Sequence, residues 1–399
     1  MNVPAERVRE QIVTLLTAWG MDPQPVRIAA EVMVDTDLAG VDSHGVSMLM
    51  DYESSKSKGK LNLRAVPRVV REGATTALVD ADAGLGHPAA VMAMGLAIKK
   101  AKATGVGVAS VFNSHHFGAA GYYAAMASKE GLVGMVTSAT RSIAVVPTRA
   151  AVPVLGTNPI AFAAPARRNA PFLLDMATST VANNKIKLYD LNGKPLPPGW
   201  VLDERGRAVT DPKVALQIIY DKKGGGGQTP VGGTAEMSSH KGYGLALMAH
   251  ILGGTLSGAS FSPIRVRTQG PGDPDRLGHF FLAIDPKAFR PEGAFEDDLD
   301  AVIDVLHATP PVDAALPVLV PGDPENAARA RRLREGIPIP PGLSEKIRQI
   351  CERAGFRSFS LDRQTFTNSV TRGRLPRCAL QCPCSWESKT CPSGRTSAE

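Results

Sequence analysis

The sequence predicts an α/β protein that does not use a Rossmann dinucleotide fold, and three observations lead to this prediction. Short β-branched runs alternate with alanine-rich stretches between residues 76 and 137, which is the pattern of strands and helices in one layered domain. The composition, 43% apolar and 21% charged, is that of an ordinary globular protein. The nearest match to a dinucleotide-binding fingerprint lacks the acidic residue that such a fold requires.

The chain opens with two predicted helices. Apolar residues recur at helical spacing from Val8 to Trp19 and stop at Gly20, which predicts an amphipathic helix with a C-terminal glycine. A second helix is predicted over residues 25–38, and it leads to the segment Asp-Ser-His-Gly at 42–45.

The middle of the chain predicts the sheet. Strands are expected over residues 77–79, 106–112 and 132–137, with helices over 89–103 and 119–129 between them. Further strands are expected over 171–174 and 280–284, and further helices over 241–252, 297–306 and 324–334.

The fingerprint test concerns Gly84, Gly86 and Ala89, which follow a predicted strand and begin a helix. A Rossmann fold needs an acidic residue about 20 positions later to bind the ribose. No Asp or Glu occurs between Asp82 and Glu130. We therefore interpret these glycines as a loop at a helix start.

Two parts of the chain predict irregular structure. Glycines fill positions 224–227, so segment 222–233 is expected to be a flexible loop. After about residue 356 all periodicity disappears, and residues 357–399 are expected to be disordered. Four of the five cysteines stand in this tail with spacing C-x3-C-x-C-x6-C, which is not the paired spacing of a zinc module. The first 350 residues contain no thiol, which excludes a disulfide framework for the main body.

The charge of the chain, +7 with a pI near 9.2, is spread rather than clustered, and only 5% of the residues are aromatic. This pattern argues against nucleic-acid binding and suits a small anionic substrate and a cofactor pyrophosphate. The N-terminal residues lack the apolar core of a signal peptide, and no apolar run approaches the roughly 18 residues of a membrane span. A cytoplasmic protein without membrane contact is expected.

Two histidines stand where proton transfer is plausible. His44 follows Ser43 at the end of the helical segment, and His116 follows directly after the predicted strand 106–112. Ligands of α/β sheets gather at the carboxyl ends of strands, and imidazole exchanges protons near neutral pH. A zinc site built from His44, His87, His115 and His116 is the weaker alternative, because adjacent histidines point apart and no His-x3-His pair exists. We expect no metal.

Four segments have the chemistry of binding loops. Thr157 and Asn158 lie in a tight polar turn between a glycine and a proline, and we expect them to contact the substrate. A second segment follows the predicted strand 171–174 and ends in two hydroxyls that could hold phosphate or ribose; it consists of Asp175, Met176, Ala177, Thr178 and Ser179. Lys241 and Gly242 begin a helix, where an anion is favoured, and Gly322 and Asp323 begin another, where Asp323 could serve only as an N-cap.

Taken together, these stretches resemble the non-Rossmann malate/L-lactate dehydrogenase family, whose relatives act on ureidoglycolate, sulfolactate, diketogulonate and cyclic imino acids. The matching segments run in the family's order from residue 42 to residue 325: DSHGV, NSHHFGAAGYYAAMA, LGTNPIAFAAP, LDMATSTVANNK, SHKGYGLALM, GHFFLAID and PGDPE.

The resemblance implies a distinctive α/β fold in which both chain ends form a helical domain around a central mixed-sheet domain that binds the nicotinamide cofactor, NAD or NADP. In this sequence the helical domain would comprise residues 1–70 and 286–356, and the central domain residues 71–285. The resemblance also implies a homodimer. It assigns proton transfer to His116 or to His44, and cofactor contacts to residues 175–179, to Lys241 and Gly242, and to Gly322 and Asp323.

The implied activity is hydride transfer between NAD(P) and a small 2-hydroxy or 2-oxo acid. Our hypothesis is that His116 handles the hydroxyl proton while His44 or Ser43 orients the oxygen. Many relatives carry an arginine four positions after the histidine of the DSHG motif, where it would bind the substrate carboxylate, but this chain has Met48. Arg141 or Arg149 could replace it.

Two alternatives follow from this difference. The first is reduction of a cyclic imino acid such as piperideine-2-carboxylate. The second is a catalytically inactive cofactor-binding or assembly protein. The sequence does not distinguish NAD from NADP.

Overall fold

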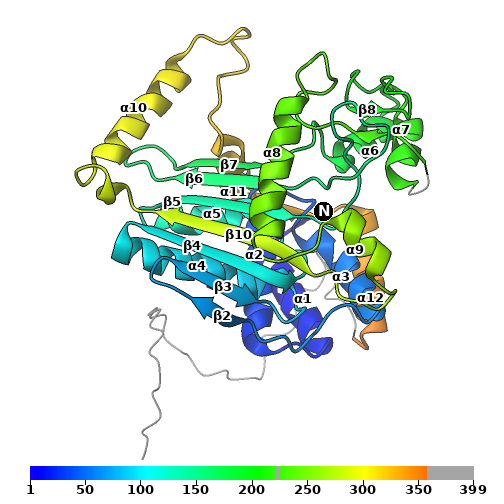
Figure 1. Ribbon diagram of the computed structural model, residues 1–399, viewed down its shortest axis with the longest axis horizontal. Coiled ribbons are helices and arrows are strands. Elements are labelled where there is room, and N and C mark those ends of the chain that lie inside the picture. The colour runs from blue at the N-terminus through cyan, green and yellow to red at the C-terminus, as the bar shows by residue number, and fades with distance from the viewer. Residues whose placement is uncertain (222–223, 357–399) are drawn as a thin grey trace, which may run out of the picture. The chain divides into compact units, whose positions relative to one another are not determined.

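The computed structural model describes residues 1–221 and 224–356. Within them, seven strands form one mixed sheet in the order β2-β3-β4-β10-β5-β6-β7 (Figure 1). The strands are β2 (Arg68–Glu72), β3 (Thr76–Asp80), β4 (Val106–Ser114), β5 (Val133–Ala139), β6 (Ile160–Ala164), β7 (Phe172–Met176) and β10 (Leu277–Ile284). Only the pair β3–β4 is parallel, and the other neighbours are antiparallel. The predicted mixed-sheet α/β fold is therefore confirmed.

Helices α4 (Gly86–Thr104) and α5 (Ala120–Lys129) cover one face of this sheet. The buried layer between them consists mainly of alanine and valine, so the helices lie close to the strands. Gly107 in β4 shows how close: a Cβ atom there would lie 1.9 Å from the carbonyl oxygen of Ala97 in α4. Helix α8 (His240–His250) crosses the opposite face and continues into a π-helical turn, Ile251–Thr255 (Figure 1).

Helices from both chain ends share a second core. They are α1 (Ala5–Ala18), α2 (Pro23–Leu38), α3 (Leu49–Ser57) and α12 (Pro341–Arg353), and a short turn, Val46–Met48, precedes α3. The ends are also joined by the pairing of β1 (Asn2–Val3) with β11 (Ile337–Pro338). Amphipathic faces explain this packing, because Ile12, Leu15 and Ile347 are almost fully buried in one cluster. The domain boundaries at residues 70, 285 and 356 stay predictions.

The remaining elements lie outside these two cores. Helices α6 (Asn183–Leu191) and α7 (Pro212–Tyr220) share a small core of their own, beside the paired strands β8 (Val201–Leu202) and β9 (Gly227–Gln228). Helix α9 (Ser262–Thr268) precedes β10, and the short turn Pro286–Ala288 follows it. Helix α10 (Ala294–Ala308) extends beyond the sheet before the chain returns to α11 (Asp323–Glu335) (Figure 1).

Strand β9 corrects one expectation. The part of segment 222–233 that the structure describes contains a buried two-residue strand, because Gly226 and Gly227 pack directly against other backbone atoms. The predicted disordered tail, 357–399, and its cysteines lie outside the described residues. Among the helices of the described ranges, none has the length and apolar character needed to cross a bilayer.

Candidate functional site

The structure brings His44 and His116 together. Their ring centroids lie 5.4 Å apart, with the planes inclined by 31°. His44 stands in the loop between α2 and α3, and His116 stands just beyond the carboxyl end of β4. Both side chains are half-buried, so each is held by the protein and still reaches the surface. Over residues 1–221 and 224–356, neither Nε2 atom has a hydrogen-bond partner, which leaves both free for a ligand.

The ring of His116 is oriented by two donors to one atom. The phenol of Tyr52 lies 2.9 Å from Nδ1 of His116, and the backbone N–H of Gly118 donates to the same nitrogen at 3.2 Å. A backbone N–H can only donate, so Nδ1 accepts and the hydrogen of the neutral ring resides on Nε2. Burial holds the pKa of His116 well below its usual value, and neighbouring imidazoles and Arg141 lower it further. His116 therefore presents a neutral N–H donor.

His44 has a different environment. The hydroxyl of Ser43 lies 2.7 Å from Nδ1 of His44, and a hydroxyl can donate or accept. Burial lowers the pKa of His44 below the usual histidine value, with no opposing charge. Its ring can consequently gain or lose a proton at Nε2 while Nδ1 keeps its partner.

The other histidines of the metal alternative point elsewhere. His115 bonds through Nε2 to the carbonyl of Lys60 at 2.7 Å, and its Nδ1 lies 3.4 Å from Asp275. His87 is fully buried, and burial lowers its pKa to about 3. In the part of the chain that the structure describes, no three His, Cys, Asp or Glu side chains gather as a metal site would require.

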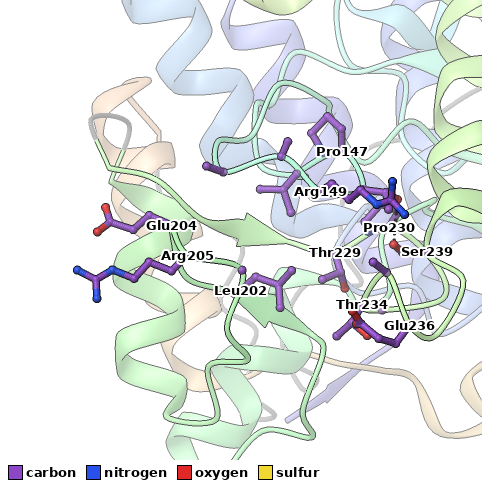
Figure 2. Close-up of a pocket in the computed structure, with 17 residues that line it drawn as sticks. Pro147, Arg149, Leu202, Glu204, Arg205, Thr229, Pro230, Thr234, Glu236 and Ser239 are labelled. Atoms are coloured by element: carbon purple, nitrogen blue, oxygen red, sulfur yellow. Dashed lines mark hydrogen bonds between the residues drawn. The ribbon is translucent and has the colours of Figure 1, made fainter.

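The two cations proposed for the substrate carboxylate lie in different places. Arg141 is close enough to lower the pKa values of both His116 and Tyr52, and its side chain is 38% exposed. One of its nitrogens, Nη1, donates to Asp275 at 2.9 Å. Arg149 instead lines a cavity of about 290 Å³ with Arg205 and Ser239, and Figure 2 shows it there. Neither histidine of the pair lines that cavity. Arg141 is thus the cation beside the histidines.

Asp175 bonds to the chain shortly after His116. Its Oδ2 accepts the backbone N–H of Gly121 at 2.7 Å, in the first turn of α5 and only five residues after His116. A Cβ atom at Gly121 would lie 2.9 Å from this carboxylate, so the close approach needs a glycine. Asp175 remains exposed as a residue at the end of β7, while the packing of its carboxyl against α5 desolvates that group and raises its pKa to about 6.

The segment at 321–323 reaches the same strand. The N–H of Leu173 in β7 donates to the carbonyl of Pro321 at 2.9 Å, and Gly322 adopts φ +109° beside it. The carboxylate of Asp323 accepts from its own backbone neighbour Val320 and from His307, both at 2.8 Å. Asp323 is therefore engaged within the protein at the first turn of α11.

The hydroxyls at 178 and 179 do not face solvent. Thr178 is fully buried and donates to the carbonyls of Thr157 and Asn158, and Ser179 donates to the carbonyl of Val181. Met176 and Ala177 stay half-buried. The accessible part of the 175–179 segment is its beginning.

Three predicted loops meet at these hydroxyls. The side chain of Asn158 is buried; its oxygen accepts from Thr140 and its nitrogen donates to the carbonyl of Ala246. Thr157 remains half-buried. Gly242 packs against the backbone of Val231, whose N–H donates to the carbonyl of Thr178 at 2.9 Å, while the neighbouring Lys241 is exposed.

These contacts fit an anionic dinucleotide. The N-termini of α5 and α11 both lie against β7, and the positive end of a helix dipole favours an anion such as a pyrophosphate. The carboxylate of Asp175 is a suitable acceptor for a ribose hydroxyl or an amide, and Lys241 adds a positive charge at the start of α8.

Sequence reasoning missed Tyr52 and Asp275. Tyr52 belongs to α3, whose mostly polar sequence gave no helical pattern, so its position seven residues after the DSHG segment was not recognised as part of the site. Asp275 lies in an irregular stretch, yet it is 3% exposed and is surrounded by Arg141, Arg265 and His115.

The chain is similar to known proteins in sequence and in fold. The family model described as malate/L-lactate dehydrogenase matches residues 3–348. A malate dehydrogenase of Pyrococcus horikoshii is 38% identical over 89% of this chain and 96% of its own length. The crystal structure of malate dehydrogenase from Entamoeba histolytica has a TM-score of 0.84 at 30% identity, covering 89% of this chain and 98% of that one. A δ1-piperideine-2-carboxylate reductase from Pseudomonas syringae pvar. tomato has a TM-score of 0.75 at 29% identity, covering 88% and 99%.

Proposed function

Because the chain belongs to the malate/L-lactate dehydrogenase family, we propose that it transfers a hydride between NAD(P) and a small 2-hydroxy or 2-oxo acid, with His44 exchanging the proton. The observation that carries this assignment is the double occupation of Nδ1 in His116. A ring whose Nδ1 accepts two hydrogen bonds, and whose pKa is strongly lowered, is a poor proton acceptor.

The two histidines then have different tasks. His116 donates its Nε2 hydrogen to the substrate oxygen and polarises it. His44 accepts the hydroxyl proton at Nε2 during oxidation and returns it during reduction, while Ser43 accepts a hydrogen bond from Nδ1 throughout. This is the reverse of the assignment favoured by the sequence, where His116 was to handle the proton.

Arg141 is proposed to bind the substrate carboxylate. Its position beside His116 and Tyr52, together with its partial exposure, supports this choice over Arg149. Asp275 accepts a hydrogen bond from Nη1 of the guanidinium, while Nη2 lies 3.8 Å from the exposed carboxylate of Asp51, too far for a hydrogen bond. A substrate carboxylate would therefore compete with Asp51 for Nη2. Met48 cannot substitute for a guanidinium, and its side chain packs into the helical core.

Asp175 and Met176 of β7, the adjacent Ala177, and the helix starts at Gly121 and Gly322 are proposed as the residues that would hold the nicotinamide cofactor. The bound cofactor would supply the hydride acceptor for oxidation of the hydroxy acid and the hydride donor for reduction of the oxo acid. Thr178, Ser179 and Asn158 are proposed to shape this region indirectly, because their side chains bond within the protein. Lys241 is proposed to contact the cofactor directly, and Thr157 to contact the substrate.

A homodimer and a cytoplasmic location remain part of the proposal. Helix α10 and the chain after it expose a series of apolar side chains, which soluble monomers rarely leave uncovered: Val302, Val305, Leu306, Val312 and Leu316. A second copy of the chain is the occupant we expect there. Sedimentation should show a dimer that Val305→Glu weakens, and a monomeric wild type would contradict this.

Reduction of a cyclic imino acid is the second candidate. It is favoured by Met48, where many relatives carry arginine, and by the similarity to the piperideine-2-carboxylate reductase. The same hydride and the same proton donor would serve a C=N bond.

The test is a panel of 2-oxo acids, 2-hydroxy acids and cyclic imino acids, followed by the absorbance of the reduced nicotinamide with NAD(H) and NADP(H) in turn. We expect turnover of an oxo acid. Faster turnover of an imino acid would favour the second candidate, and cofactor binding without any turnover would favour an inactive binding protein.

Two variants then test the histidines. His44→Gln should lower kcat by roughly 10²- to 10⁴-fold, the usual contribution of a general acid or base, without changing the cofactor Kd. His240→Gln, at an exposed histidine, is the control. Should His44→Gln turn over normally while His116→Gln does not, the assignment made from the sequence would be restored.

A further inference from the structure

Arg332 is separated from Asp42 by 290 positions in sequence, yet it binds the loop that carries His44. It belongs to the last turn of α11 and is 7% exposed. Its Nη1 donates to the backbone carbonyl of Asp37 at 2.6 Å and also to the carboxylate of Asp42, and its Nη2 donates to the second carboxylate oxygen of Asp42 at 3.1 Å. One planar guanidinium thus joins the end of α2 to a residue two positions before His44.

The same loop is held at its other end by Asp37. The Oδ2 atom of Asp37 accepts the backbone N–H of Val46 at 2.8 Å, two positions after His44. Gly45 lies so close to this carboxylate that a Cβ atom there would be 1.9 Å from Oδ1. Residues 42 and 46 are therefore both bonded, and the turn between them, closed by the His44 N–H to the Val41 carbonyl at 3.0 Å, has little freedom.

We propose that Arg332 is a positioning residue for His44, because its two-pronged contact with Asp42 fixes the loop that sets the distance and angle between the His44 and His116 rings. This inference rests on the proposed function, in which His44 exchanges the proton. A fork is needed: guanidinium binds both carboxylate oxygens and a carbonyl at once, whereas an ammonium binds as a point charge.

Helix α11 connects the Arg332–Asp42 contact to the segment next to β7. The helix begins at Asp323, next to β7, and Arg332 lies nine residues later, about 14 Å along the axis. The segment proposed to border the cofactor and the loop that carries His44 are thereby attached to one rigid element.

The chain supplies a matched control on the same helix. Arg329, one turn earlier, forms a comparable two-pronged pair with Asp35 of α2, at 2.7 and 2.9 Å. Removing this pair breaks an α11–α2 contact but touches nothing in the loop 41–46. If Arg332 affects kcat only through the packing of α11 on α2, variants of Arg329 and Arg332 should therefore lower kcat by the same factor.

The experiment compares Arg332→Met with Arg329→Met in the full chain, measuring kcat, cofactor Kd by fluorescence, and the pH profile of kcat/KM for oxidation. We expect Arg332→Met to lower kcat roughly 10- to 100-fold, the cost of misplacing a reacting group by about 1 Å, with cofactor Kd unchanged. Its acid limb should move up in pH, because a loosened His44 becomes hydrated and an unpaired Asp42 favours the imidazolium. Arg332→Lys should recover part of kcat, and Arg329→Met should resemble the wild type.

Equal kcat in Arg332→Met and Arg329→Met, or a fall in cofactor affinity that matches the fall in kcat, would overturn the proposal. If Arg332→Met does not fold, the proposal is tested instead by changing the carboxylates that the two arginines bind. Asp42→Asn, at a side chain that is 54% exposed, should lower kcat, and Asp35→Asn should not. His44→Gln separates the two ideas. Full turnover in that variant removes the proposed function of His44, whereas its loss together with a wild-type-like Asp42→Asn removes only the inference about Arg332.

Discussion

The phenol of Tyr52 contacts Nδ1 of His116 at 2.9 Å, although 64 positions separate the two residues in the chain. Tyr52 is almost fully buried in α3, and burial raises its pKa well above the ordinary range, so it stays a neutral donor. It also lies 3.4 Å from Nε2 of His87. The buried hydroxyl of Tyr52 and the Gly118 N–H thus both contact Nδ1 of His116, which leaves the ring hydrogen on Nε2.

Tyr52→Phe should lower kcat by roughly 2- to 10-fold, which corresponds to the loss of one neutral hydrogen bond worth about 0.5–1.5 kcal/mol. Only the Gly118 N–H would then hold the tautomer. Ring ¹⁵N shifts of His116 should show a mixture of tautomers in the variant and a single one in the wild type. Tyr122→Phe, at the neighbouring half-buried tyrosine of α5, is the control. A variant with a single tautomer and full kcat would show that Gly118 suffices.

Arg141→Gln should reduce kcat/KM for a 2-oxo acid by roughly 10- to 150-fold, because a charged hydrogen bond to a carboxylate contributes about 1.5–3 kcal/mol. Asp275 would keep Arg265, Lys60 and His115 as partners, so the fold should persist. Arg149→Gln should leave kcat/KM unchanged. Steady-state kinetics with both variants decides between the two cations, and the opposite ranking would assign the carboxylate to Arg149.

Acid should weaken the fold through buried histidines. Burial lowers the pKa of His279 to about 4, against 6.5 for a free histidine. The unfolded state therefore binds the additional proton between about pH 6.5 and pH 4, and the stabilisation from neutral His279 is lost as the pH falls through that window. His279→Gln should be less stable than the wild type at neutral pH, and this difference should shrink by about 1.4 kcal/mol per pH unit on acidification. Urea unfolding measures it, and a difference independent of pH would contradict the buried neutral state.

Asp37 should have the opposite effect on the pH dependence of stability. Burial raises the pKa of its carboxyl from 3.8 to about 7, and Asp42 adds to this, while the Val46 N–H and Arg332 oppose it. The folded state binds the additional proton between about pH 4 and pH 7, so stability from protonated Asp37 is present at low pH and is lost as the pH rises through 7. Asp37→Asn should gain on the wild type by about 1.4 kcal/mol per pH unit across this range and level off above it. Unfolding free energies at several pH values check the slope, and a flat difference would mean that Asp37 stays ionised.

The local spacing of apolar residues predicted many of the helices and strands. The helices α1, α2, α4 and α5 and the strands β3, β4 and β5 lie where periodicity predicted them, because each combines a clear spacing of apolar residues with a glycine or polar stop. Helix α3 was missed since its sequence, LMDYESSKS, has no apolar stripe; it forms where Leu49 and Tyr52 are buried by other helices. Strand β6 was missed because IAFAA alternates too little for a strand pattern.

The sequence likewise predicted only part of the candidate site. Motifs alone indicated His44, His116 and the segments near Asp175, Lys241 and Gly322, since each combines reactive side chains with loop-forming glycine, serine or proline. They could not show that the hydroxyls of Thr178 and Ser179 point inward, because that depends on which carbonyls the folded chain places beside them.

The amino-acid order by itself determined the alternation of strands and helices, the failure of the Rossmann fingerprint and the family motifs, because these depend on neighbours within about 20 positions. Only the tertiary structure decided that His44 faces His116, that Tyr52 and Gly118 occupy one nitrogen, and that Arg141 rather than Arg149 stands beside them. Hydrogen bonds and charges act over a few ångströms, and only folding brings residues so distant in the chain within that reach.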